Sequence, residues 1–148
     1  MREQFTKELK DAMKAGDKRR VDTIRMINAA LKDRDIEARG HGKTVSDEEV
    51  LGLLQKLVKS RQESAEIYEK AGRSDLATQE REEIAVIQSF LPQPLDAAEV
   101  EAAISAAITE TGAASIKDMG KVVAALKAKY AGRIDFAKAS ASVKAKLG

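Results

Sequence analysis

Apolar residues recur along this chain every three or four positions, the spacing that gathers side chains on one face of an α-helix. No segment shows the alternation of apolar and polar residues that a half-buried β-strand requires. Asp17 and Ser46 are predicted to cap helices, and Glu49 completes a capping box with Ser46. Together with glycines that favour helix ends, these signals predict four helices that end near residues 16, 39, 72 and 91.

The segment LeuProGlnProLeu at 91–95 interrupts the helical pattern. Each proline lacks an amide hydrogen and disfavours a helical backbone in the residue before it, so no helix continues through the segment. Beyond it, three shorter helices are predicted, capped by Asp96, Ser115 and Asp135. The sequence therefore predicts an all-α protein, in which a four-helix N-terminal lobe (1–90) is joined by a Pro-containing linker (91–95) to a smaller three-helix C-terminal lobe (96–148).

Composition narrows the possible classes of protein. Aromatic residues make up only 3% of the chain and tryptophan is absent, so the core must be aliphatic. Charged residues make up 34%, against about 25% in ordinary globular proteins. The absence of cysteine excludes disulfides, thiolate metal sites and a cysteine nucleophile. The first residues contain no apolar run typical of a secretory signal, and we expect a cytoplasmic protein with no membrane partner.

The N-terminal lobe offers little chemistry. The segment GlyHisGlyLysThr at 40–44 is similar to the end of a phosphate-binding loop, but Glu37 stands where that motif needs glycine, and a helix precedes it instead of a strand. His41 is the only histidine and has no cysteine to share a metal with. Most glutamates lie one helical turn from a lysine or arginine, as on a solvated helix face. We therefore expect no catalytic residue, no metal site and no cofactor.

Charge is distributed unevenly along the chain. Residues 1–92 contain 18 basic and 18 acidic residues, and residues 93–112 contain four acidic residues and no basic one. Residues 113–148 contain eight basic and two acidic residues, which gives this last quarter a net charge of +6. A basic segment of this kind favours a polyanionic partner such as nucleic acid, although ordinary lysine solvation would produce the same composition.

The predicted sixth helix separates its lysines from its apolar side chains. Its apolar residues fall on one stripe, and the lysines spread over the other side. Stacking aromatics for single-stranded bases are missing, so any RNA contact would be to the backbone and overall shape. The residues predicted to bind RNA are Lys117, Lys121, Lys127, Lys129, Arg133 and Lys138.

Several segments, taken together, resemble a known family. They include LysAspMetGlyLysValVal at 117–123 and GlyArgIleAsp at 132–135, and the block 59–76 is the most recognisable. In the same order, and over nearly the whole chain, the segments resemble the GatB/YqeY family, in particular its YqeY-like branch. The matching segments are 21–32, 59–76, 82–95, 117–123, 132–135 and 143–147.

The resemblance implies a role linked to tRNA. The C-terminal lobe is similar to the tail domain of the B subunit of the glutamine-dependent aminoacyl-tRNA amidotransferase, a carbon–nitrogen ligase with glutamine as amido-N-donor. In that enzyme the tail helps to hold tRNA, whereas the catalytic centres of the enzyme have no counterpart here. The expected function is an accessory module that binds tRNA or other structured RNA, with an amidotransferase or aminoacyl-tRNA synthetase as a further candidate partner. Two alternative functions remain: a helical protein-interaction adaptor without RNA binding, and a part of an amide-transfer enzyme.

The resemblance also marks individual positions in the C-terminal lobe and the linker. Two positions depart from the family pattern: Val123 stands where methionine is frequent, and Phe136 where glycine is common, which weakens the expectation of a close backbone approach there. Gly120 is predicted to lie inside a helix, where glycine costs about 1 kcal/mol relative to alanine. Close helix packing, or close approach by an RNA backbone, would each explain it, and packing is slightly favoured. The positions that match the family motif are Pro92, Lys117, Met119, Gly120, Lys121, Gly132 and Asp135.

Overall fold

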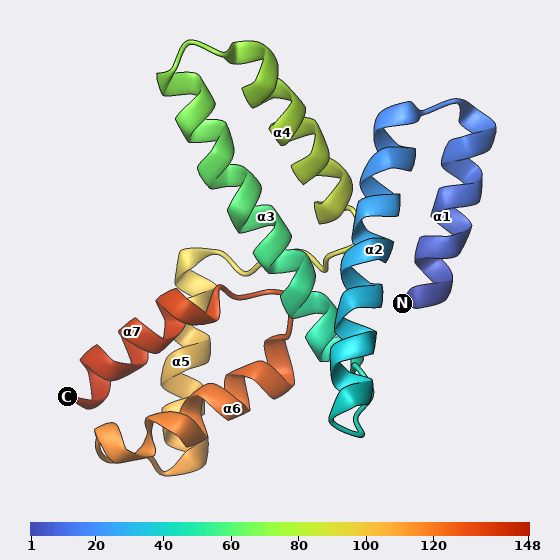
Figure 1. The fold of residues 1–148 in the computed structure, drawn as a ribbon. Helices are drawn as coiled ribbons and strands as arrows, with labels where there is room; N and C mark the ends of the chain where they lie inside the picture. Colours follow the sequence, from blue (N-terminus) through green and yellow to red (C-terminus); the bar gives the residue numbers. More distant parts are fainter. The chain divides into compact units, whose positions relative to one another are not determined.

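The computed structural model describes residues 1–148 and contains seven α-helices, one short 3-10 helix and no strand (Figure 1). The predicted all-α fold is confirmed. The chain divides into two compact units, Met1–Leu91 and Pro92–Gly148. None of the helices combines the length and the apolar character needed to cross a membrane.

Each unit contains its own set of helices. The N-terminal unit contains α1 (Arg2–Ala15), α2 (Lys18–Gly40), α3 (Asp47–Lys70) and α4 (Ser74–Gln88). The C-terminal unit contains α5 (Ala97–Thr111), the 3-10 helix η1 (Ile116–Asp118), α6 (Met119–Tyr130) and α7 (Phe136–Leu147). In the N-terminal unit α3 and α4 form the most extensive pair, and in the C-terminal unit α6 packs against both α5 and α7.

Side-chain caps fix most of the helix starts. Ser46 accepts a hydrogen bond from the backbone N–H of Glu49 at 3.1 Å, and the Glu49 carboxylate accepts one from the backbone N–H of Ser46. Asp96 and Glu99 form the same reciprocal capping box at the start of α5. Each such cap contributes about 1 kcal/mol to stability. The caps predicted at Asp17, Ser46, Asp96 and Asp135 are all confirmed.

The predicted cap at Ser115 is wrong. The Ser115 side chain makes no capping hydrogen bond, and the chain first passes through η1 before α6 begins at Met119. Asp118 organises this entry instead, because its carboxylate accepts a hydrogen bond from the backbone N–H of Ala114 at 2.9 Å. That hydrogen bond is the main reason why the pKa of Asp118 lies below its usual value.

The N-terminal unit is closed by an aromatic contact between its first and last elements. The rings of Phe5 on α1 and Phe90, which follows α4, meet edge to face with centroids 4.9 Å apart. The Arg20 guanidinium lies 5.4 Å from the Phe90 centroid and forms an ion pair with Glu8 at 2.9 Å. The remaining core is aliphatic, as the composition predicts, and consists of Ile24, Ile27, Leu31, Val50, Leu53, Leu54, Val58, Ile84 and Ile87.

The C-terminal unit has a separate core made of smaller side chains. Alanines on α5 and α7 let the helices approach one another closely around Ile104, Leu126 and Val143. The buried residues are Ala103, Ile104, Ala107, Val122, Leu126, Ile134, Ala139 and Val143.

We predict that Phe90→Ala destabilises the N-terminal unit by about 3–5 kcal/mol, the usual cost of removing a buried phenylalanine ring. Phe90 is only 5% exposed and supports both Phe5 and Arg20. Chemical denaturation followed by circular dichroism measures the loss. Met13→Ala is the control, because Met13 is 54% exposed and its truncation should change the unfolding free energy little. Equal effects of the two variants would contradict this description of the core.

Candidate nucleic-acid interface

The lysines predicted to bind RNA lie on the exposed surface of the C-terminal unit. They come from η1, α6 and α7, whereas Arg133, in the loop between α6 and α7, is partly buried. The exposed lysines of the predicted set are Lys117, Lys121, Lys127, Lys129 and Lys138.

The outer faces of α6 and α7 consist almost entirely of lysines and very small residues. Along η1 and α6 the exposed positions one helical turn apart are Lys117, Gly120, Lys121, Ala124 and Ala128. Along α7 they are Ala137, Lys138, Ala141, Lys144 and Ala145. Long lysine side chains therefore extend from a surface made mainly of alanine and glycine, so the contacts that this surface offers are mainly charge contacts.

Few carboxylates neutralise these lysines. Lys117, Lys138 and Lys144 have no carboxylate within ion-pair distance, and Lys121 approaches Asp118 only at 3.9 Å. Lys146, in contrast, forms an ion pair with Glu101 of α5 at 3.0 Å. Lys144 was not among the predicted residues, although its place one turn from the exposed Ala141 could have indicated it.

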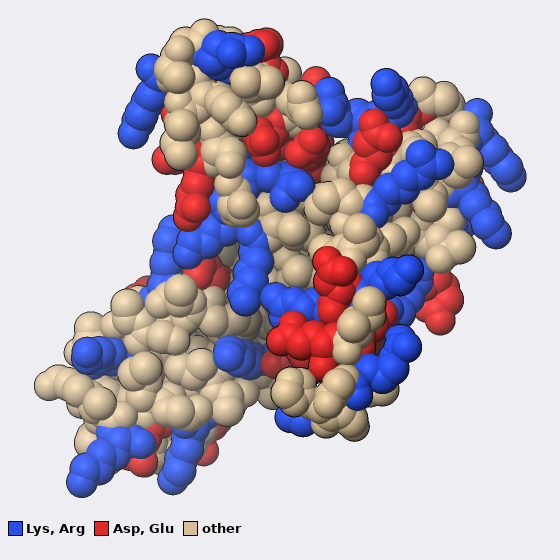
Figure 2. Space-filling view, viewed as in Figure 1, with Lys and Arg blue, Asp and Glu red and all other residues tan.

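Lys127 and Lys129 are placed differently from the other lysines. The Lys127 ammonium lies 5.9 Å from the ring centroid of Phe136, and the Lys129 ammonium lies 5.7 Å from that of Tyr130. The two lysines flank the apolar stripe of α6, with Lys127 next to α7 and Lys129 beside a small hollow between α5 and α6. In the part of Figure 2 where Figure 1 places α5–α7, the blue side chains are separated by broad uncharged surface. Lys127 and Lys129 therefore lie on different flanks of α6.

Arg133 already has a hydrogen-bond partner within the protein. Its Nε donates to the backbone carbonyl of Gln93 at 2.9 Å. The side chain is thus directed at the segment that leads into α5, and it is less available to an external phosphate than the exposed lysines are.

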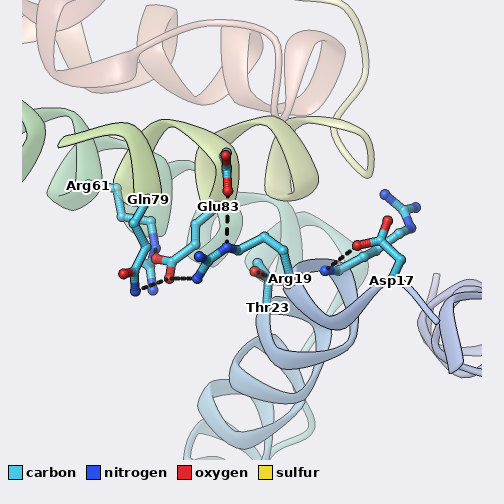
Figure 3. A network of polar contacts seen from close by, with 8 residues as sticks. Asp17, Arg19, Thr23, Arg61, Gln79 and Glu83 are labelled. Carbon is cyan, nitrogen blue, oxygen red and sulfur yellow. Dashed lines mark hydrogen bonds and ion pairs between the residues drawn. The ribbon is translucent and has the colours of Figure 1, made fainter. Parts of the chain in front are cut away.

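The most extensive cluster of charged side chains elsewhere lies in the N-terminal unit (Figure 3). Glu83 of α4 accepts a hydrogen bond from Arg61 of α3 at 3.0 Å and lies 3.9 Å from Arg19 of α2, which also binds Glu82 at 3.2 Å. Arg61 and Glu83 are only 16% and 19% exposed. Because these groups satisfy one another, the cluster joins α2, α3 and α4, and it offers no unpaired acid or base for catalysis.

The segment 40–44 lies at the end of α2 and in the loop that leads to α3, with His41 exposed. A shallow hollow of about 170 Å³ beside this loop is lined in part by Arg34, His41 and Lys43. No group of three or more histidine, aspartate or glutamate side chains is arranged to hold a metal ion anywhere in the structure.

Comparison with known proteins identifies the family. A family model described as Yqey-like protein matches residues 2–147. The chain belongs to the Yqey-like family. Among curated relatives, three fungal proteins carry the name "Altered inheritance of mitochondria protein 41, mitochondrial". That of Lachancea thermotolerans is 38% identical over 106 residues, which cover 70% of this chain and 56% of the relative.

Two further relatives with the same name show similar identity. The Vanderwaltozyma polyspora protein is 34% identical over 121 residues, which cover 76% of this chain and 63% of the relative. The Eremothecium gossypii protein is 35% identical over 84 residues, which cover 57% of this chain and 45% of the relative. The chain thus matches between about half and two thirds of the length of these relatives.

The structure assigns local roles to several positions of the Yqey-like motif. Met119 packs against the C-terminal core, and Asp135 caps α7 by accepting hydrogen bonds from the backbone N–H groups of Ala137 and Lys138. Gly132 adopts a φ of 78°, a left-handed conformation that favours glycine, at the turn between α6 and α7. These three residues have structural roles in the helices and the turn that carry the lysines.

Gly120 does not have the packing role that the sequence favoured. It is exposed in the first turn of α6, and a Cβ atom built on it would meet no atom within 4 Å. The packing explanation is therefore wrong, and the backbone at this position is open to solvent.

We predict that Gly120→Ala leaves the fold intact and raises the free energy of unfolding by up to about 1 kcal/mol. Alanine loses less backbone entropy than glycine when a helix forms, and no neighbour obstructs its methyl group. Denaturant titration of the two proteins measures the difference. Destabilisation by the methyl group would show that the position is packed after all.

Proposed function

We propose that this Yqey-like protein is an accessory module that binds tRNA or another structured RNA through the phosphate backbone. The observation that carries the proposal is the set of exposed lysines without close carboxylate partners, Lys117, Lys138 and Lys144, together with Lys121. They stand on a surface of alanine and glycine in the part of the chain whose net charge is +6.

Lysines on such a surface suit phosphate groups better than bases. Each lysine that neutralises a phosphate releases condensed counterions, which favours binding without reading sequence. Phe136 and Tyr130, the aromatic residues of the C-terminal unit, are partly buried and have lysine ammonium groups beside their rings. Neither ring is free to stack on a base, as aromatic side chains do in proteins that bind single-stranded nucleic acids. The proposed mode is therefore recognition of backbone and shape.

The similarity of the C-terminal lobe to the amidotransferase tail domain supports tRNA as the RNA. On this proposal the protein is related to a carbon–nitrogen ligase that uses glutamine as amido-N-donor, without being catalytic alone. An amidotransferase or an aminoacyl-tRNA synthetase is the proposed protein partner. The names of the three fungal relatives mention neither RNA nor amide transfer. The word mitochondrial in those names describes the relatives. Cytoplasmic location of this chain stays a prediction.

We predict that changing Lys117 and Lys121 together to glutamate lowers the affinity for a tRNA transcript roughly tenfold or more at low salt, because two phosphate contacts become repulsions. The loss should be similar for RNAs of different sequence. Fluorescence anisotropy with labelled transcripts measures the affinity, and circular dichroism checks that helicity is unchanged.

The matched control changes Lys10 and Lys14 to glutamate. These lysines are also exposed and four residues apart, on α1, and the substitution alters the net charge of the chain by the same amount. Equal losses from the two double variants would contradict a site on η1 and α6. No measurable binding by the unaltered protein would exclude the proposal and favour the protein-interaction adaptor.

A further inference from the structure

The linker is anchored at both ends. Phe90 is buried in the N-terminal core, and Leu91 packs against the same core. Leu95 packs against the C-terminal core. Between these positions, Pro92, Gln93 and Pro94 are exposed to solvent. If only the packing of Leu91 and Leu95 held the linker, the backbone between these two residues could rotate freely.

One residue shortens this free segment. The Nε of Arg133 donates a hydrogen bond to the backbone carbonyl of Gln93 at 2.9 Å, and the backbone carbonyl of Arg133 accepts one from the N–H of Leu95 at 2.9 Å. The side chain and the main chain of Arg133 thus bind linker groups on either side of Pro94.

Arg133 itself is held in place by the loop between α6 and α7. Its backbone N–H donates to the carbonyl of Tyr130 at 2.9 Å, and the neighbouring Ile134 is only 3% exposed. Gly132, immediately before it, makes the left-handed turn at the end of α6. The linker is therefore bound to a fixed part of the C-terminal unit.

We propose that Arg133 is a clamp that makes Gln93–Leu95 part of the C-terminal unit and confines the hinge between the two units to Leu91–Gln93. The proline ring fixes the φ angle of Pro92. The remaining rotations are then mainly the ψ angles of Leu91 and Pro92 and the φ angle of Gln93. The clamp restricts the range of orientations that the two units sample. It also gives a role to this arginine that does not depend on RNA.

The absence of cysteine from the chain provides a direct test. Spin labels on Ser60→Cys and Ala102→Cys, both at exposed positions on α3 and α5, report the distribution of distances between the two units by pulsed electron paramagnetic resonance. In the labelled protein, Arg133→Ala should broaden this distribution, because the Gln93 carbonyl loses its donor.

Lys138→Ala is the matched control, because it removes an exposed basic side chain of the same unit that forms no hydrogen bond or ion pair. It should leave the width unchanged. Should Arg133→Ala fail to fold, Arg133→Met keeps most of the apolar stem but has no hydrogen-bond donor for the Gln93 carbonyl, and it should broaden the distribution as well. An unchanged width in a folded Arg133 variant would overturn the clamp.

Discussion

Four of the six acidic side chains of the C-terminal unit bind the protein backbone, and the charge of the unit's surface depends on this. Asp96 and Glu99 cap α5, Asp118 binds the N–H of Ala114, and Asp135 caps α7. Glu101 pairs with Lys146. Charge–dipole and hydrogen-bond interactions at helix starts thus occupy most of the acids. The lysines on the outer faces of η1, α6 and α7 are left with little compensation, although the net charge of the whole chain is only +2.

The N-terminal unit uses charge in the opposite way. Six of its nine arginines form internal ion pairs, as between Arg61 and Glu83 at 3.0 Å, and between Arg2 and Asp35 through two hydrogen bonds of 2.7 and 2.8 Å. The planar guanidinium suits such fixed pairs, whereas lysine is a flexible, strongly hydrated charge. The C-terminal unit follows the same division of roles. Its single arginine, Arg133, binds the linker, and its lysines face solvent.

Local signals were sufficient to predict most of the fold. Asp17, the Ser46–Glu49 pair and Asp135 act within a few residues of themselves, so the sequence alone identified the helix starts and the all-α class. Two features were not predicted. At the start of α6, Asp118 accepts a hydrogen bond from the N–H of Ala114, whereas a cap by Ser115 was expected. The hydrogen bond from Arg133 to Gln93 joins residues 40 positions apart, and local sequence patterns do not reveal such a contact. The lysines of α6 were predicted as one group because the sequence does not show which flank faces α5 and which faces α7.

The central claim is that exposed lysines of the C-terminal unit bind an RNA backbone, and the salt dependence of RNA affinity tests it most directly. If roughly three to five lysines each neutralise a phosphate, a plot of log affinity against log salt should have a slope of about −2 to −5. The measurement requires only the purified protein, a tRNA transcript and a series of salt concentrations. A slope in that range is the predicted result. An affinity that does not change with salt, or no binding even at low salt, would contradict the account.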